Sequence, residues 1–424
     1  MINKQAKYKF PPLETMVAQA VCGEHPEQLT PKLLEEYQLR ELKKQIEYAK
    51  ENSSFFAKHL ANIDLQTINS YEDLGQIPLM SAEDIINDGA AMACLPLNKI
   101  PRFTTIRSSG TSGPAKQLYF SDHDLDKIVD FFVYGGQHLT TPMQRVMIYL
   151  PGDAIGSIGE LLTRSFVRRG VESYTFGAIR DFEAAAKACE DFRANCVIGL
   201  PSQILQLART APHLRPDSAF ITADYIADSL VKSIEDIWQC EVLSHYGVSE
   251  CGLGVGVECP AYAGYHMRYN DLLFEIIDPL TGEILPSGQY GEVVFSTLNR
   301  EAMPLIRYRT GDIACLLDTP CQCGGVLPRL SRIKGRLTNQ INCGSSSISI
   351  NELDEIIFAI PEVLDYQPKL SNGFLQLYVK TPAENLAHIQ EVSQKALPNF
   401  KVQVLPGEGF YTRGTIKRTI ITED

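Results

Sequence analysis

The alternation of strands and helices is the feature that most limits how this chain can fold. From about Phe103 onward, short apolar or β-branched runs alternate with stretches of helical character. The strand-like runs are residues 146–150, 171–176, 196–200 and 219–223, and helices are expected at 181–194 and 228–239. This alternation is typical of a layered α/β domain with a largely parallel sheet.

The regions on either side of this core differ from it. Residues 1–75 have the amphipathic spacing of helices. From about residue 272, strand-like runs are separated by turn signals, which predicts an antiparallel β-meander or barrel part. After Gly335, a helix near 351–359 and further strands predict a small α+β domain. We therefore expect a large layered α/β N-terminal domain, residues 1–335, and a C-terminal domain, residues 336–424.

Composition excludes several classes of protein. The 424 residues include 39 basic and 51 acidic side chains, for a net charge of −12, and no block of like charge stands out. Nucleic acid and membrane surfaces are therefore not expected partners. We find neither a run of 18 apolar residues nor a signal-peptide core, and the 11 cysteines are an odd number. These features predict a cytoplasmic protein without a disulfide framework.

A segment rich in small and hydroxyl residues follows β-branched positions 104–106. It reads RSSGTSGPAK over residues 107–116 and combines four hydroxyls, two glycines and a lysine. Small residues let the backbone approach a ligand, and hydroxyls, amides and the lysine can bind phosphate. The segment is not a Walker A loop. The alternative is a flexible surface linker.

Two further motifs place a carboxylate next to a glycine turn. Residues 245–250 read HYGVSE after a strand-like run, so an aromatic ring could stack on a base and Glu250 could ligate Mg²⁺. Residues 307–312 read RYRTGD, where Asp312 could accept hydrogen bonds from ribose hydroxyls. Taken singly, each motif is equally compatible with an ordinary turn.

Together and in this order, these motifs resemble those of the AMP-forming acyl-adenylate enzyme superfamily, most closely its phenylacetate–coenzyme A ligase branch. SSGTSGPAK resembles the phosphate loop of that family, YGVSE its YG-x-[ST]-E motif, YRTGD its ribose-binding TGD, and RIKGR its following Gly-Arg. The resemblance extends over nearly the whole chain. It implies that a carboxylate attacks the α-phosphate of MgATP to give an acyl-adenylate, and that a thiol then takes the acyl group.

The resemblance also implies a set of site residues. Glu250 would bind magnesium, Tyr246 would lie near adenine, and Asp312 and Arg336 would hold the ribose. The positions implied to hold the β- and γ-phosphates are Ser108, Ser109, Gly110, Thr111, Ser112, Gly113 and Lys116. The remaining nucleotide-binding positions are Ala223 and Asp224 beside the edge of adenine, and Gly247 and Ser249 of the YGVSE motif. Positioning and charge neutralisation are what phosphoryl chemistry mainly asks of a protein.

The chain departs from the family at its C-terminal end. The family's small C-terminal domain is mobile and delivers a catalytic lysine, but Thr415 occupies that position here. Lys417 lies two residues on, and in an extended strand it would point the same way, about 7 Å further along. Lys417 is therefore a candidate catalytic replacement, and the alternative is a solvated tail charge. The hinge after the Gly-Arg motif reads Leu337-Thr338-Asn339 and lacks the family's usual charge.

A cysteine–histidine set is a candidate metal site. Cys259 and His266 are seven positions apart, and Cys321 and Cys323 flank a single residue in a Pro/Gly-rich turn. Three thiolates and one imidazole can complete a closed tetrahedral structural zinc site, and comparable positions resemble those that bind zinc in some relatives. Cys251 and Cys315 are reserve ligands. The alternatives are free buried thiols and a His266 that lines the acyl pocket.

The resulting hypothesis is an AMP-forming acid–thiol ligase that uses ATP, Mg²⁺ and coenzyme A and holds a structural Zn²⁺. The resemblance implies an apolar slot between residues 150–152, 176–177, 199–202 and 246–247, which suits an aromatic or medium-sized acid. A carrier-protein thiol or an amine is the alternative acceptor. The rival class is a nucleotide-binding or regulatory homologue that has lost turnover. A homodimer is one expectation for the oligomeric state.

Overall fold

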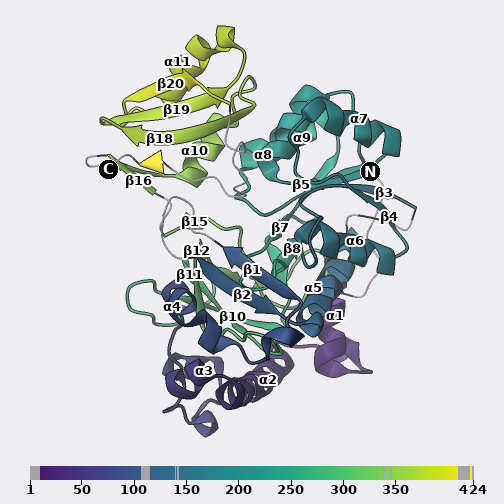
Figure 1. Ribbon diagram of the computed structural model, residues 1–424, viewed down its shortest axis with the longest axis vertical. Helices are drawn as coiled ribbons and strands as arrows, with labels where there is room; N and C mark the ends of the chain where they lie inside the picture. Colours follow the sequence, from purple (N-terminus) through teal and green to yellow (C-terminus); the bar gives the residue numbers. More distant parts are fainter. Residues whose placement is uncertain are drawn as a thin grey trace.

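A nine-stranded sheet forms the centre of the computed structural model, which describes residues 10–106, 115–138, 140, 143–337, 340–343, 346–408 and 421–422 (Figure 1). The strand order is β13-β14-β9-β8-β7-β6-β5-β3-β4. The parallel strands are β3 (Arg145–Tyr149), β4 (Glu172–Thr175), β5 (Cys196–Gly199), β6 (Ser218–Ile221) and β7 (Glu241–Tyr246). The antiparallel strands are β8 (Gly256–Glu258), β9 (Tyr265–Met267), β14 (Arg329–Leu330) and β13 (Leu316–Leu317).

Helices cover both faces of the parallel strands. They are α5 (Asp122–Gly135), α6 (Ile158–Arg168), α7 (Phe182–Phe192), α8 (Pro201–Thr210) and α9 (Asp228–Trp238). Successive side chains of a strand point to opposite faces, and here they enter two different apolar clusters. Ile148 packs in the cluster that contains α5 and α6, whereas Met147 and Tyr149 pack in the one that contains α7, α8 and α9. The predicted layered α/β architecture is confirmed.

The predicted antiparallel meander is confirmed as a separate sheet. Its strands, in order, are β10 (Leu272–Ile277), β11 (Gly291–Thr297), β12 (Tyr308–Ala314) and β15 (Gly335–Arg336). A two-stranded antiparallel hairpin, β1 (Arg102–Ile106) and β2 (Lys116–Phe120), lies before α5. Strand β2 begins at Lys116, whose ammonium lies 3.5 Å from the hydroxyl of Tyr308 in β12.

The described part of the N-terminal region, from residue 10 onward, is mainly helical, as its spacing predicts. The helices are α1 (Pro12–Cys22), α2 (Pro31–Asn52), α3 (Ser54–His59) and α4 (Ala82–Met92). The Thr30 hydroxyl accepts a hydrogen bond from Leu33 N at 3.2 Å and so caps α2. The buried Gln38 amide donates to the carbonyls of Tyr269 and Leu272 at 2.6 and 2.9 Å. Helix α2 is therefore fixed to the start of the meander.

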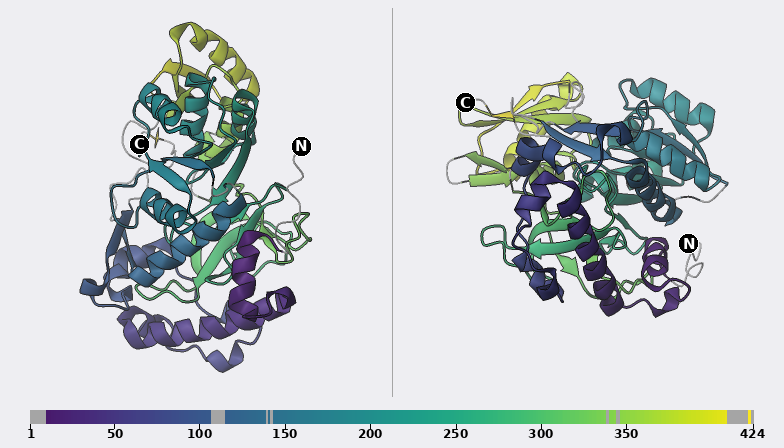
Figure 2. Two further views of the ribbon diagram at one scale, coloured as in Figure 1. Left: turned by 90° about the vertical axis from the view of Figure 1, so that its right-hand side faces the viewer. Right: turned by 60° about the horizontal axis from the view of Figure 1, so that its bottom comes forward.

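The last part of the chain forms its own sheets. The elements are β16 (Gln340–Cys343), β17 (Ser346–Ser349), α10 (Ile350–Ile357), β18 (Asp365–Ser371), β19 (Phe374–Lys380), α11 (Leu386–Ala396), β20 (Val402–Pro406) and β21 (Ile421–Thr422). Strands β20, β19, β18 and β21 lie side by side in that order. Figure 2 shows this sheet at the opposite end of the molecule from α1, α2 and α3. The domain division after residue 335 remains a prediction.

Helix α10 attaches this C-terminal part to α8 and α9. The Glu355 carboxylate accepts hydrogen bonds from Asp228 N at 2.8 Å and Ser229 N at 3.1 Å, at the N-terminus of α9. Arg209 of α8 donates to the carbonyl of Phe358 at 3.0 Å and to that of Val363. A negative charge at a helix N-terminus is favourable because unpaired N–H groups and the helix dipole meet there. One apolar cluster also spans both parts of the chain.

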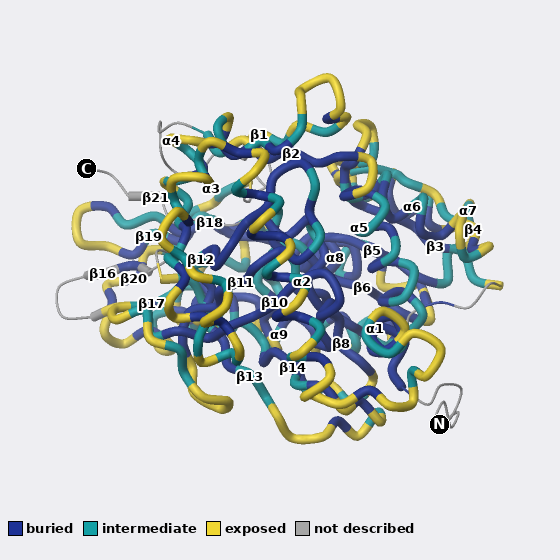
Figure 3. The backbone as a smooth tube through the Cα atoms, turned by 90° about the horizontal axis from the view of Figure 1, so that it is seen from below, coloured by how far each residue is buried: buried dark blue, intermediate teal, exposed yellow. Residues whose placement is uncertain are grey.

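Burial follows the layers. The strands in the interior are buried, and exposed residues gather on the peripheral loops and helix surfaces (Figure 3). Among the described residues, every helix is too short or too polar to span a membrane.

Candidate active site and candidate metal centre

The carboxyl ends of the parallel strands bring together several of the predicted binding positions. Strands β6 and β7 pair in register up to Ile221 and Ser244, so Ala223 and Tyr246 emerge at the same edge. Ala223 has φ +73°, a left-handed conformation that is unusual for a residue with a side chain. The residues expected to line the acyl slot follow β3, β4 and β5 at this edge. Ligands of open α/β sheets bind at such an edge.

Glu250 lies at the centre of a polar cluster. Its Oε1 contacts the Lys116 ammonium, and the Tyr308 hydroxyl donates to the same oxygen at 3.2 Å. The Lys116 Nζ and Tyr308 hydroxyl are 3.5 Å apart. Burial, followed by the charge of Glu250, raises the pKa of Tyr308, which keeps its hydroxyl a proton donor at neutral pH. Lys116 and Glu250 therefore come together from β2 and the loop after β7, although 134 positions separate them.

Asp312 forms a second polar cluster. The Tyr246 hydroxyl donates to its Oδ2 at 2.8 Å, and Arg336 Nε donates to its Oδ1 at 2.5 Å. The residues Asp312 and Arg336 are register partners in β12 and β15. Burial would lower the pKa of Arg336, but the Asp312 carboxylate outweighs it and raises that pKa. The Tyr246 ring is thus held by its hydroxyl beside the predicted ribose-binding carboxylate.

The loop after β7 is compact. A Cβ on Gly247 would lie 1.7 Å from the Leu253 carbonyl oxygen, so only glycine fits at this position. Ser249 O accepts from Gly252 N at 3.0 Å, and Asp224 Oδ1 accepts from Tyr225 N at 2.9 Å. These bonds fix the backbone around two of the predicted binding positions.

Several predicted residues fall outside the described part of the chain. They are Ser108, Ser109, Gly110, Thr111, Ser112 and Gly113 of the phosphate loop, Thr338 and Asn339 of the hinge, and Thr415 and Lys417 near the C-terminus. Their roles remain predictions. Of the phosphate-binding residues implied by the resemblance, Lys116 is the one that the structure describes.

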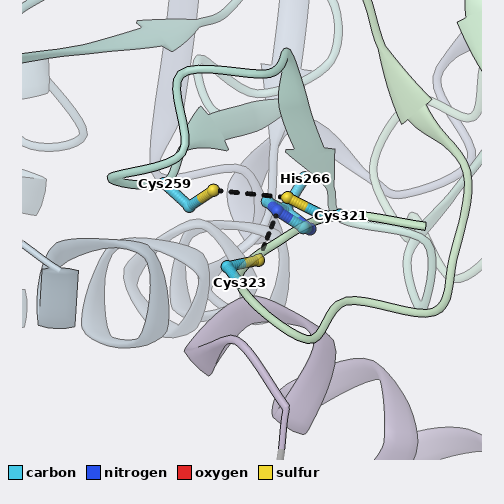
Figure 4. Close-up of side chains that lie close together, drawn as sticks. All are labelled: Cys259, His266, Cys321 and Cys323. Atoms are coloured by element: carbon cyan, nitrogen blue, oxygen red, sulfur yellow. Dashed lines mark hydrogen bonds between the residues drawn. The ribbon is translucent and has the colours of Figure 1, made fainter. Parts of the chain in front are cut away.

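The structure brings the four predicted zinc ligands together. Cys259, His266, Cys321 and Cys323 each offer an atom within 4.8 Å of the others, and their side chains converge on one point (Figure 4). The Cys259 and Cys321 sulfurs are 3.6 Å apart, and Cys323 Sγ lies 3.3 Å from His266 Nε2. Zn–S bonds of about 2.3 Å and Zn–N bonds of about 2.0 Å give tetrahedral edges of roughly 3.5–3.8 Å. The donor set therefore fits a tetrahedral zinc ion.

Glu14 is a site residue that sequence reasoning missed. Its Oε1 lies 2.9 Å from His266 Nδ1, and its Oε2 accepts from Val326 N at 2.8 Å. The Glu14 and His266 side chains are both 1% exposed. A carboxylate on Nδ1 fixes the ring so that Nε2 faces the three sulfurs, which is the usual arrangement around ligating histidines. No spacing signal could reveal this pair, because 252 positions separate its members.

Comparison with known proteins follows from this geometry. No protein-family model matches the sequence. The chain is 26% identical to phenylacetate–coenzyme A ligase of Pseudomonas putida over 416 residues. This match covers 91% of this chain and 92% of that protein. It is 27% identical over 339 residues to the Thermus thermophilus enzyme of the same name, covering 77% of this chain and 75% of that protein.

Solved structures agree on the fold. A 2-hydroxyisobutyryl-CoA ligase in its postadenylation state, in complex with R3-HIB-AMP, superposes with a TM-score of 0.79 at 18% identity, over 99% of this chain and 93% of that chain. The chain thus has the fold of the acyl-adenylate-forming ligases. Within that class, the predicted resemblance to the phenylacetate–coenzyme A ligase branch is confirmed.

Proposed function

We propose that the protein is an AMP-forming ligase that activates a carboxylic acid with ATP and passes the acyl group to coenzyme A. In the first step the acid's carboxylate oxygen attacks the α-phosphorus of ATP, and the bond to the leaving pyrophosphate breaks. In the second step the thiol sulfur attacks the acyl carbonyl carbon, the thiol proton is lost, and AMP leaves. The phenylacetate–coenzyme A ligases named above support this reaction and an aryl acid as the substrate class.

The observation on which this proposal rests is the convergence of Lys116 and Glu250 beside the Asp312–Arg336 pair. Lys116 supplies positive charge for the phosphates, and Glu250 is a hard oxygen ligand of the kind that Mg²⁺ prefers. Magnesium, when bound, neutralises phosphate charge. Asp312 and Arg336 would hold the ribose, with Tyr246, Ala223 and Asp224 beside adenine. The carboxylate of Glu250 and the ammonium of Lys116 contact one another.

The first step also calls for a catalytic lysine in the C-terminal part of the chain. Thr415 cannot neutralise negative charge, so we propose that Lys417 does so. Lys417→Ala is expected to reduce adenylation well over tenfold, because one contact to developing charge is worth a few kcal/mol. An unchanged rate would make Lys417 a tail charge. Restored or increased activity in Thr415→Lys would show where the chemistry had been weakened.

We further propose that Cys259, His266, Cys321 and Cys323 bind a structural zinc ion. All four positions are taken by protein side chains, so no coordination site is open to substrate. The metal would join the end of β8, the strand β9 and the turn at 321–323 near the ribose-binding strand β12. Metal analysis is expected to find about one zinc per chain. A metal-free protein in which the three thiols of Cys259, Cys321 and Cys323 are titratable would contradict it.

Pyrophosphate release from MgATP tests the reaction directly. We would assay a panel of aryl and short-chain acids, each with and without coenzyme A. Release stimulated by one acid would support adenylation, and its dependence on coenzyme A, compared with a carrier-protein thiol or an amine, would identify the acceptor. If no acid in the panel stimulates pyrophosphate release although ATP or AMP still binds, the result would favour a homologue that binds nucleotide without turnover.

A further inference from the structure

Two buried arginines bind the loop that bears Glu250. Arg300 Nη1 donates to the Glu250 carbonyl at 2.9 Å, and Arg268 Nη2 donates to the Cys251 carbonyl at 3.0 Å. Arg300 is 7% exposed and Arg268 is 2% exposed. They come from different segments, after β11 and after β9. Two adjacent carbonyls of the loop are therefore each fixed by a charged donor.

The loop itself cannot easily take another shape. Cys251 N and Leu253 N both donate to the Val248 carbonyl, and Gly252 and Leu253 have φ +84° and +66°. A Cβ on Gly252 would lie 2.9 Å from Ile128 Cδ1 and 3.2 Å from Arg300 Nη2. Residues 248–253 thus form a turn. The N–H groups of Cys251 and Leu253 are paired within the turn, and the carbonyls of residues 250 and 251 each accept a hydrogen bond from an arginine.

Arg300 is in turn fixed by two elements, α2 and β2. Gln45 of α2 accepts from Arg300 N at 2.6 Å and donates to its carbonyl at 2.9 Å. The guanidinium lies 5.0 Å from the centre of the Phe120 ring at the end of β2. Strand β2 also bears Lys116, so one strand contacts both the side chain of Glu250 and the arginine that holds its backbone.

Arg268 borders a small polar cavity. Its guanidinium lies 3.6 Å from Asp271 Oδ2 and 5.6 Å from the centre of the Phe131 ring. The cavity has a volume of about 10 Å³ and is also lined by Arg300 and Asp124. Within the described residues, Arg268 Nε and Nη1 have no hydrogen-bond partner. A cavity of this size with such polar walls can hold one water, which would complete the hydrogen bonding of Arg268.

We propose that Arg300 and Arg268 are positioning residues that aim the Glu250 carboxylate at the magnesium of bound ATP. The inference rests on the proposed function, because it assigns Glu250 that role. Lysine keeps the charge but lacks the planar fork with which arginine contacts an aromatic ring and a carbonyl together. In a lysine variant the backbone at residue 250 would be released, and the carboxylate would lose its fixed direction.

The test compares Arg300→Lys and Arg268→Lys with a matched control. Arg169 also donates to a backbone carbonyl, that of Thr140 at 2.6 Å, and its guanidinium lies 5.9 Å from the centre of the Phe166 ring, away from Glu250. Arg169→Lys therefore reproduces the chemical change elsewhere. We would measure the Mg²⁺ concentration for half-maximal ATP–pyrophosphate exchange, together with AMP affinity. The expected result is a rise of about tenfold in the Mg²⁺ requirement in the two variants, as a lost charged hydrogen bond implies, with AMP affinity and the control unchanged.

The outcomes separate this inference from the proposed function. A wild-type protein without exchange would remove both. If the wild-type protein catalyses exchange and both lysine variants keep its Mg²⁺ requirement, the inference alone is wrong. This holds even if the melting temperatures of the variants are lower, because a purely structural role changes stability and not metal dependence. If the lysine variants do not fold, Gln45→Glu replaces them. It retains the acceptor for Arg300 N but loses the donor to Arg300 O, and the same criterion applies.

Discussion

Glu250 combines contacts that belong to different functions. Its side chain meets Lys116 and Tyr308, while its carbonyl is bound by Arg300. Glu250→Gln keeps the size of the side chain and removes the charge, so ATP–pyrophosphate exchange is expected to fall by about a hundredfold or more. The exposed Glu47→Gln on α2 is the control. Exchange that stays within about threefold of wild type would exclude Glu250 from the magnesium site.

Glu14 allows a separate prediction about zinc. Glu14→Gln weakens the orientation of the His266 ring, so zinc affinity is expected to fall by about 10–100-fold. Competition with a chromogenic chelator would measure it, and the exposed Glu24→Gln is the matched control. Equal affinity in the two variants would show that Glu14 serves packing alone.

At this scale the sequence revealed residues that lie in recognisable motifs. Cys321 and Cys323 form a local spacing pattern, and Glu250 lies in YGVSE, so the sequence predicted all three as site residues. Glu14 and Arg300 were not, because each acts through a hydrogen bond between distant segments. Their residue types are common, and only the fold identifies their partners.

The contact between α10 and α9 is the clearest case at the scale of elements. Glu355→Gln replaces a carboxylate at the N-terminus of α9 with a neutral amide, so the attachment of the C-terminal part is expected to weaken. Hydrogen exchange at the amides of Asp228 and Ser229 is expected to accelerate about 3–10-fold, which corresponds to about 1 kcal/mol.

The exposed Glu384→Gln, outside this contact, is the control for that experiment. Unchanged exchange at both amides would show that the apolar cluster shared by the two parts holds them together without the carboxylate.

Element types were predicted more reliably than their ends. Strand β3 spans 145–149 where 146–150 was expected, and α9 spans 228–238 where 228–239 was expected. Local hydrophobic patterning determines which element forms. The helix ends depend on particular caps, such as Asp181, whose side chain accepts from Ala184 N at 3.0 Å and begins α7.

For the molecule as a whole, His245 makes stability dependent on pH. It is 3% exposed among Phe131, Phe132 and Phe220, and its Nδ1 pairs with the Thr222 hydroxyl at 2.5 Å. Burial, together with the charge of Arg268, lowers its pKa from 6.5 to about 3. Between these values the unfolded chain binds a proton that the folded chain does not. The contribution is therefore fully present above pH 6.5 and is lost as pH falls below it.

The expected loss from His245 is about 1 kcal/mol in unfolding free energy per pH unit between pH 6 and 4. Urea unfolding at pH 7, 6 and 5 would measure it. In His245→Asn, which cannot be protonated, this slope is expected to be shallower. The same slope in both proteins would place the acid sensitivity elsewhere.

The arrangement of the sheets was beyond the sequence. Alternation predicted a parallel core, but the order of nine strands places β9 and β14 next to one another although 62 positions separate Met267 and Arg329. Such neighbours are chosen by the packing of the complete chain, not by local propensity.

The pairing of Glu14 with Val326 has a consequence for how the protein is made. Helix α1 is synthesised before the amide that binds its carboxylate, which follows 312 positions later. At translation rates of about 5–20 residues per second, the delay is roughly 15–60 s. During that interval the Glu14 carboxylate, which is 1% exposed in the folded protein, lacks its partner. Leu13 and Val17 beside it also lack part of the packing that buries them in the folded protein. The growing chain must therefore carry this segment without that partner until residue 326 has been made.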